Sequence, residues 1–401
     1  MSNLTDQEIR NIVANNSKAE AENADREAPV NGVVPNTTRK LLIVGCGDGG
    51  CNIASTISEA VPDETFVITY NTSNRGVRGV AANMQLLAAG EDGAGKVRTY
   101  SKEVFKNNIY AKLLEKVQMT LNEIKDIAYI ILCSTADGGT GSGISPMAAK
   151  LLADNTEVPV IVMGVYPEMT EDATAQFNAM QWQSEINQIG LPYFILDNNA
   201  AADGVRKKRD IHDTVNAQAA SIISLLAGRE FNNSNISIID NRNLYMLLAQ
   251  LGGRLVAGVS TSKPSSNQTL DDLILNILEN NYQPAPANIR GIGVFIRGPK
   301  EFIDRMDTSI PEVQKKYGTA ILKFAHIEVA DEVKTAILCT GCSEASARIT
   351  LMKNRYEDIM ASQREQANLA SDLLSGLTNP LGAVGQKKTR PAEANVSALD
   401  L

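Results

Sequence analysis

The feature that most constrains the fold is a run of small residues between a predicted strand and a predicted helix. The apolar run at 130–133 predicts a buried strand, and 144–153 predict a helix. A helix that begins after glycines presents free backbone N–H groups at its positive end, where phosphate binds. We therefore predict a phosphate-binding loop, with a structural turn as the alternative. The loop comprises Asp137, Gly138, Gly139, Thr140, Gly141, Ser142 and Gly143, and the Thr140 and Ser142 hydroxyls are expected to add donors.

A second glycine loop follows the apolar run at 41–44 and opens a helix, so it has the same phosphate-binding chemistry. Its glycines also fit the dinucleotide fingerprint, which expects an acidic residue at the end of the second strand. The sequence has Tyr70 and Asn71 there. A nicotinamide-dependent Rossmann oxidoreductase is thus disfavoured but kept as an alternative. The loop comprises Gly47, Asp48, Gly49, Gly50, Cys51 and Asn52.

A third glycine-rich segment, Gly93, Ala94, Gly95 and Lys96, nearly spells a P-loop. Val97 stands where a P-loop has the Ser or Thr that holds magnesium, so a P-loop NTPase is disfavoured. The same glycines still fit around a terminal phosphate.

Strand and helix patterns alternate up to about residue 210, which predicts a doubly wound α/β domain with a parallel sheet. A long helix follows and ends near Gly228. A second, mixed α+β unit with antiparallel pairing is expected from about residue 241. The strands are predicted at 41–44, 66–70, 128–133, 158–165, 193–196, 290–296, 320–326 and 335–339, and two helices of the second unit at 244–251 and 270–278.

Composition excludes several classes of protein. The net charge is −8 without a long basic run, so direct nucleic-acid binding is not expected. No apolar stretch of about 18 residues predicts a membrane span, and the N-terminus does not look like a signal peptide. The five cysteines lack a disulfide framework and form no complete metal site. We expect a cytoplasmic protein without a bound structural metal.

The glycine loops, in this order, resemble those of the tubulin/FtsZ superfamily. Gly138 to Gly143 is similar to its signature loop, and the loops at 47–52, 71–73 and 93–96 are similar to its other phosphate loops. The motifs span residues 40–250 and look closest to plasmid and bacteriophage tubulin-like proteins of the TubZ type. The resemblance implies that Pro167 and Glu171 lie near the ribose, that Asn198 approaches the nucleoside, and that Asn216 reads guanine.

The resemblance implies GTP or GDP with Mg²⁺ as ligands, and a doubly wound GTPase domain, a long central helix and a second α+β domain. The expected partner is a second copy, added head to tail in a cytomotive filament that positions or segregates phage or plasmid DNA in a bacterial host. A DNA-binding adaptor or cargo would use the C-terminal tail. The expected segments are a flexible or partner-ordered extension (1–37), GTP-binding domain (38–210), central helix (211–229), activation domain (230–343), C-terminal helix (344–377) and disordered tail (378–401).

In this superfamily a loop of the next subunit completes the site with a pair of acids. Asp240 fits the first acid, but Asn243 stands where the second belongs. An amide cannot deprotonate water, and loss of a positioned base costs roughly 10²- to 10⁴-fold in rate. The resemblance therefore implies an assembly-activated, weak GTPase. Two alternatives stay open: Asp240 caps a helix, or the protein is a filament scaffold with little hydrolysis.

Overall fold

A computed structural model describes residues 39–73, 79–88, 92–202, 207–228, 244, 247–248, 253–265, 267–318, 321–329 and 331–377. The described strands form one ten-stranded sheet with the order β3-β2-β1-β4-β5-β6-β7-β10-β8-β9. Their bounds are β1 (Lys40–Cys46), β2 (Thr65–Asn71), β3 (Met84–Leu87), β4 (Ile127–Thr135), β5 (Val160–Tyr166), β6 (Tyr193–Asp197), β7 (Arg254–Ser262), β8 (Gly291–Gly298), β9 (Ile321–Glu328) and β10 (Val333–Cys342).

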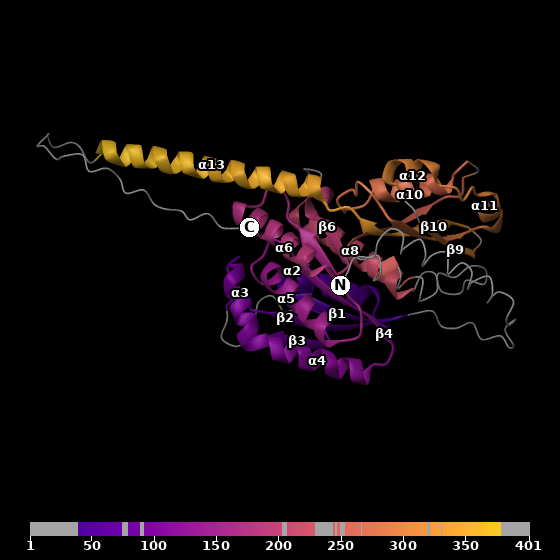
Figure 1. Cartoon of the computed structure of the whole chain (residues 1–401), viewed down its shortest axis with the longest axis horizontal. Coiled ribbons are helices and arrows are strands. Elements are labelled where there is room, and N and C mark those ends of the chain that lie inside the picture. Colours follow the sequence, from indigo (N-terminus) through magenta and orange to yellow (C-terminus); the bar gives the residue numbers. More distant parts are fainter. Residues whose placement is uncertain are drawn as a thin grey trace, which may run out of the picture.

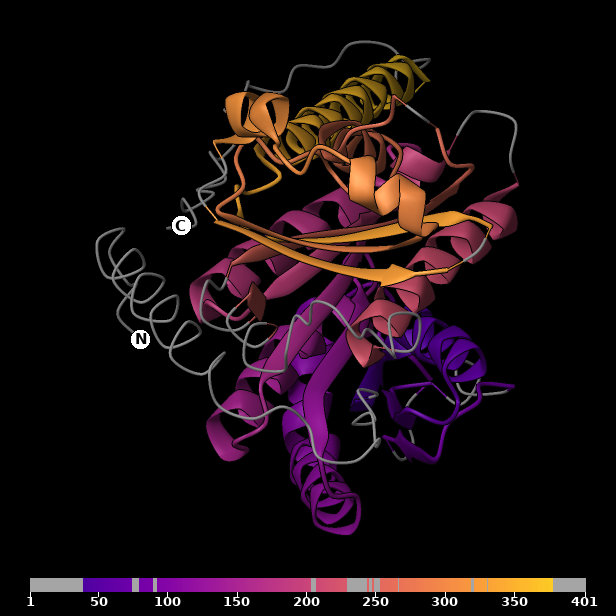
Figure 2. The same ribbon diagram turned by 90° about the vertical axis from the view of Figure 1, so that its right-hand side faces the viewer.

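The first six strands are parallel and lie between two layers of helices (Figures 1 and 2). One face packs on α2 (Gly47–Ala60) and α8 (Lys208–Ala227), and the other on α5 (Thr140–Asn155) and α6 (Ala173–Ile189). The strands are apolar along their whole length because both faces are covered. This confirms the predicted doubly wound fold. The smaller helices here are α3 (Arg98–Val104), the π-helix η2 (Phe105–Ile109), α4 (Tyr110–Glu123) and α7 (Asn198–Ala201).

The second unit continues the same sheet. Strand β7 pairs parallel to β6 through Tyr193↔Arg254 and Phe194↔Leu255, and β10 runs antiparallel to both β7 and β8. The β8–β9 pair is parallel, which differs from the antiparallel pairing expected of this unit. Its core lies under α10 (Leu270–Glu279), α11 (Lys300–Arg305) and α12 (Pro311–Tyr317).

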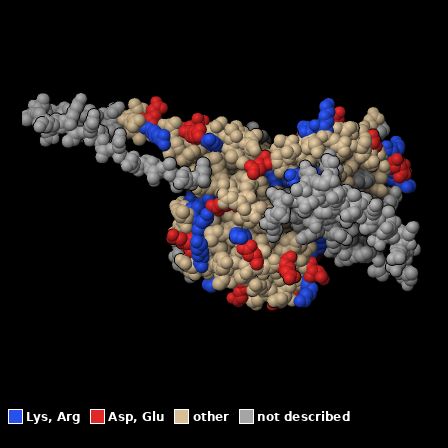
Figure 3. Space-filling view, in the orientation of Figure 1, with Lys and Arg blue, Asp and Glu red and all other residues tan. Residues whose placement is uncertain are grey.

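The last described helix, α13 (Ser346–Leu377), packs on α6 at its start and then extends beyond the body of the molecule (Figure 1). Residues 361–370 are all exposed. Among the described residues, no helix is both long and apolar enough to cross a membrane. Basic and acidic side chains are interspersed over the face shown in Figure 3, and the net charge is −8.

The centre of the parallel sheet has no spare volume at Gly164. A Cβ added there would lie 2.2 Å from the ring of Trp182, a fully buried residue of α6 that faces the sheet. We expect Gly164→Ala to lower the free energy of unfolding by about 1–3 kcal/mol because the ring must move. Trp182 is the only tryptophan, so its fluorescence in a urea titration reports the change directly. An unchanged midpoint would contradict this packing.

Candidate functional site

Two glycine loops touch each other where adjacent parallel strands end. Strand β1 leads into α2 and its neighbour β4 leads towards α5, so both loops lie at the same edge of the sheet. Gly47 has a φ of +69°, and a Cβ on it would lie 2.8 Å from the backbone nitrogen of Gly141. Glycine is therefore required at position 47 both for its backbone conformation and for its lack of a side chain.

The two helices that begin at these loops lack side-chain caps. The residues before α2 and α5, Cys46 and Gly139, make no side-chain hydrogen bond to the first-turn amides. Uncapped N–H groups at the positive end of a helix are suited to an anion. Two such ends at one sheet edge form a cradle with the chemistry that a polyphosphate needs.

The hydroxyls of the second loop are already engaged. The Thr140 Oγ1 lies 2.7 Å from the Thr72 Oγ1, and the Ser142 hydroxyl donates to the carbonyl of Gly138. Either threonine hydroxyl can be the donor in the first of these contacts, so the Thr140 proton is not committed to the loop. The role of both hydroxyls as phosphate donors stays a prediction, and the backbone amides are further donors.

The third loop lies against the second. A Cβ on Gly139 would lie 2.9 Å from the Val97 nitrogen, and the Asn178 amide donates to the carbonyls of Lys96 and Asp137, at 3.0 Å each. Lys96 itself has a left-handed backbone, with φ of 64°. Asn178 of α6 was not predicted from the sequence, because nothing in a helical pattern marks one asparagine as a link between loops.

Charged side chains border these loops. The Lys96 Nζ lies 2.7 Å from Asp172 and 3.6 Å from Glu171, and Lys208 also bonds to Glu171. Burial lowers the pKa of Lys96, but Asp172 and Glu171 raise it more, so the pKa stands above the ordinary value. Both lysines are therefore cationic at neutral pH. Lys208, at the start of α8, was not predicted from the sequence.

A cavity of about 220 Å³ opens beside the loops. The strand-end loops and α8 all contribute, and His212 lies one helical turn before Asn216. Seven of the residues predicted from the sequence line this cavity: Gly49, Asn52, Asp137, Pro167, Glu171, Asn198 and Asn216. The remaining lining residues are Thr135, Val165, Glu168, Lys208 and His212. The Oε1 of Glu168 is buried and has no hydrogen-bond partner among the described residues.

Other predicted residues lie beneath or beyond the cavity lining. The Cys51 side chain is fully buried, its sulfur faces the Tyr70 carbonyl, and burial raises its pKa to about 12. Only its backbone remains for ligand contact. Asn71 donates to Asp48 at 2.6 Å, which links the first loop to the end of β2. Asp240 and Asn243 lie outside the described residues.

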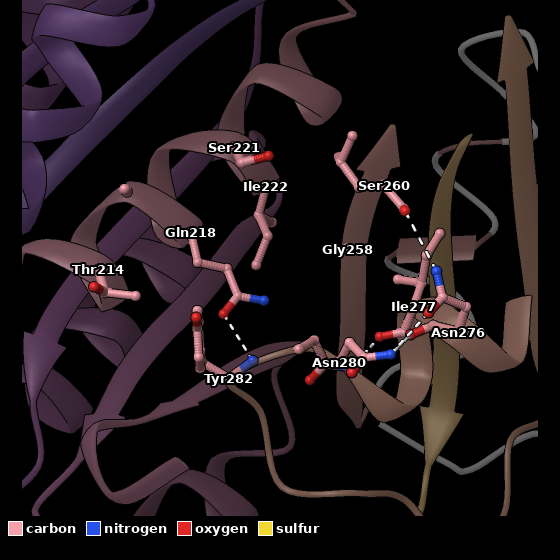
Figure 4. A pocket seen from close by; sticks show the side chains of 13 residues that line it. Thr214, Gln218, Ser221, Ile222, Gly258, Ser260, Asn276, Ile277, Asn280 and Tyr282 are labelled. Atoms are coloured by element: carbon pink, nitrogen blue, oxygen red, sulfur yellow. Dashed lines mark hydrogen bonds between the residues drawn. The ribbon is translucent and has the colours of Figure 1, made fainter. Parts of the chain in front are cut away.

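A larger cavity of about 460 Å³ lies between α8 and the second unit (Figure 4). Its lining is carboxamide, hydroxyl and aliphatic, and the Gln218 side chain accepts a hydrogen bond from the Tyr282 amide at 2.9 Å. None of the glycine loops lines it, and it carries no charged side chain. A polyphosphate is bound by backbone amides of glycine loops and by cationic side chains. Because only the smaller cavity offers both kinds of group, it is the candidate nucleotide site.

The sheet order and the two layers of helices are those of the tubulin/FtsZ fold. Residues 40–205 match the model of the Tubulin/FtsZ family, GTPase domain. The chain is 23% identical to the tubulin-like protein CetZ5 of Haloferax volcanii, over 83% of this chain and 95% of the relative. It is 22% identical to the tubulin-like protein TubZ of Clostridium botulinum C phage, over 84% of this chain and 88% of the relative.

Solved structures agree with this assignment of the fold. The GTPγS-bound protofilament of CetZ2 from Haloferax volcanii has a TM-score of 0.66 at 19% identity, covering 81% of this chain and 99% of that one. The family model covers the first, parallel part of the sheet, and the solved structures show that the chain shares the tubulin/FtsZ fold. The relatives include CetZ, TubZ and FtsZ proteins, so the TubZ type in particular stays a prediction.

The contact between the two glycine loops gives a testable result. Gly47→Ala places a Cβ against Gly141, whereas Gly79→Ala meets nothing within 4 Å at a similar φ of +76°. Both variants carry the cost of a left-handed backbone, which is about 1–2 kcal/mol. We expect Gly47→Ala to lose about 1–3 kcal/mol more, from overpacking, in chemical denaturation. Equal losses would mean that the loops are not in contact.

Proposed function

We propose that this chain binds GTP or GDP in the 220 Å³ cavity and polymerises head to tail into filaments. The observation that carries the proposal is one cavity lined by Gly49 of the first glycine loop, Asp137 of the second, and Asn216 of α8. The third loop packs on the second, and the two helices that start at the first two loops have no side-chain caps. The loops supply amide donors to the phosphates, and α8 supplies groups for the base.

On the nucleoside side, the Asn216 amide has both a donor and an acceptor, which match the O6 and N1–H edge of guanine. His212, one turn earlier, also lines the cavity, and its ring is proposed to stack on the base. For the ribose, Glu168 is better suited than the expected Glu171. Glu171 is paired with Lys96 and Lys208, whereas Glu168 has a buried oxygen without a partner among the described residues.

On the phosphate side, Lys96 and Lys208 supply the positive charge that glycine-loop amides lack. Both are paired with carboxylates here, and a nucleotide would compete for them. The described residues contain no cluster of three metal-ligating side chains. Mg²⁺ usually binds nucleotide phosphates and one or two carboxylates, and Asp137 in the cavity lining fits that role. When bound, the ion would neutralise phosphate charge.

Self-assembly is supported by exposed apolar side chains beside the third loop. Val97 is 51% exposed and Tyr100 is 38% exposed. Apolar groups around a ligand site are suited to burial by a second copy of the chain. Similar folds occur in a CetZ2 protofilament and in a two-stranded TubZ filament. Hydrolysis is proposed to need Asp240 from the neighbouring subunit and to be slow because of Asn243.

The proposed cellular role is to position or segregate phage or plasmid DNA through an adaptor on the tail at 378–401, which lies outside the described residues. The similarity to a phage TubZ supports this role. A filament scaffold with little hydrolysis is the second candidate, favoured by Asn243. The oxidoreductase alternative loses support because Asn71 at the end of β2 bonds to Asp48 and supplies no acid for a ribose.

Sedimentation with phosphate release measured in the same tubes tests assembly and hydrolysis. We expect GTP and a non-hydrolysable GTP analogue to pellet the protein, and ATP and NAD to leave it in solution. Phosphate release should rise with protein concentration and fall about 10²-fold or more in Asp240→Ala, since a positioned carboxylate is lost. Rapid turnover by dilute protein would argue against an interface-completed site.

Base recognition is tested separately with Asn216→Ala. Loss of the paired donor and acceptor should weaken GDP binding by about 1–3 kcal/mol, because buried polar edges of the base lose their partners. ADP binding should be unaffected. Thr214→Ala, half a turn away on α8 in the lining of the larger cavity, is the matched control. An equal loss in both variants would place the base elsewhere.

A further inference from the structure

Helix α13 contacts the loops beside the proposed nucleotide cavity through the buried Arg348. Arg348, in the first turn of α13, is 6% exposed, and its Nε and Nη2 donate to the two carboxylate oxygens of Asp197 at 2.7 and 3.1 Å. Asp197 ends β6 and immediately precedes Asn198, which lines the cavity. The contact joins residues 151 positions apart. The C-terminal helix is therefore fixed to one of the nucleoside loops.

The same guanidinium also holds the loop after β5. Its Nη2 donates to the carbonyl of Pro167 at 2.5 Å, and Pro167 lines the cavity too. Two turns further along α13, the Nε of Arg355 donates to the Met169 carbonyl at 3.0 Å. The Met169 amide in turn donates to the Asn199 side chain at 3.2 Å. Two cavity loops are thus joined to each other and to α13.

We propose that Arg348 is a positioning residue for the nucleotide: it holds the Pro167 and Asn198 loops in place and couples nucleotide binding to the docking of α13. This inference rests on the proposed nucleotide site. Arg348 does not line the cavity and touches no ligand, so it acts through the loops. A coupling of this kind is reciprocal, since a ligand that stabilises the loops also stabilises the helix bound to them.

The chemistry of the contact explains why arginine is needed. Burial raises the pKa of Asp197 and the bonds from Arg348 oppose that rise, so removal of Arg348 leaves a buried carboxylate without this counter-charge. The planar guanidinium bonds a carboxylate through two nitrogens and a carbonyl at once. A lysine at this position keeps the charge but not the planar fork, so it cannot reproduce the two-nitrogen contact with Asp197 together with the bond to Pro167 in the same geometry.

Calorimetric titration of the full chain with GDP tests the proposal. We expect Arg348→Gln to weaken GDP binding by about 5- to 30-fold, a typical coupling between sites, and Arg348→Lys to weaken it by less. Lys353→Gln is the matched control, because it removes the same charge from an exposed position of the same helix. The Lys353→Gln variant should bind GDP with the same affinity as the wild-type protein.

The outcomes separate this inference from the proposed function. If the unchanged protein does not bind GDP, the nucleotide site itself is wrong and the inference falls with it. If it binds, and both Arg348 variants bind as tightly as Lys353→Gln, the positioning role alone is wrong. Should Arg348→Gln fail to fold, Arg348→Lys decides, since it keeps the charge beside Asp197.

Amide hydrogen exchange distinguishes coupling from a merely structural role, because only coupling makes the exchange rate of α13 depend on GDP. In the unchanged protein, GDP should slow amide exchange in the first two turns of α13, at 346–353, although these residues do not touch the ligand. The effect should be reduced in Arg348→Lys. Helix α10 in the second unit, which lines the larger cavity and not the smaller one, is the internal control. Unchanged exchange in α13 on addition of GDP would overturn the coupling.

Discussion

The close approach of the two glycine loops at the ends of β1 and β4 is the constraint on which the site depends. Gly47 and Gly141 can meet only because neither has a side chain and because Gly47 adopts a left-handed backbone. Their contact brings the N-termini of α2 and α5 to one edge of the sheet. The third loop then packs on Gly139, so the phosphate cradle is assembled from backbone and not from charged side chains.

Because the cradle offers only dipoles, full charges come from longer side chains at its border. Lys96 and Lys208 stand there, and both are held by Glu171 or Asp172. Such partly exposed pairs are weakly bound and exchange readily for a polyanion. The two cations at the border of the cradle can therefore change partners. Buried Arg98, which donates to the Ser142 carbonyl, adds a positive charge behind the second loop.

The nucleoside side is organised differently, by connections between distant parts of the chain. Helix α8 contributes to both the small and the large cavity, through Asn216 in one and Gln218 in the other. Helix α13 contributes nothing to either lining, yet Arg348 supports the loops after β5 and β6. By its contacts, the described C-terminal helix thus belongs with the proposed nucleotide-binding unit, although it follows the second unit in sequence.

The sequence by itself determined the doubly wound fold and the presence of the glycine loops, because buried parallel strands and strand-to-helix glycines leave local patterns. It did not reveal β3 or β7. Successive apolar side chains of β7 pack into two different cores, with Leu255 in one and Val256 in the other. The strand therefore lacks the alternation of apolar and polar residues by which a strand with one buried face is recognised. Lys208, Asn178 and Arg348 were also missed for a physical reason. Their partners lie 37, 82 and 151 residues away, and only the tertiary structure decides which polar side chain meets which loop.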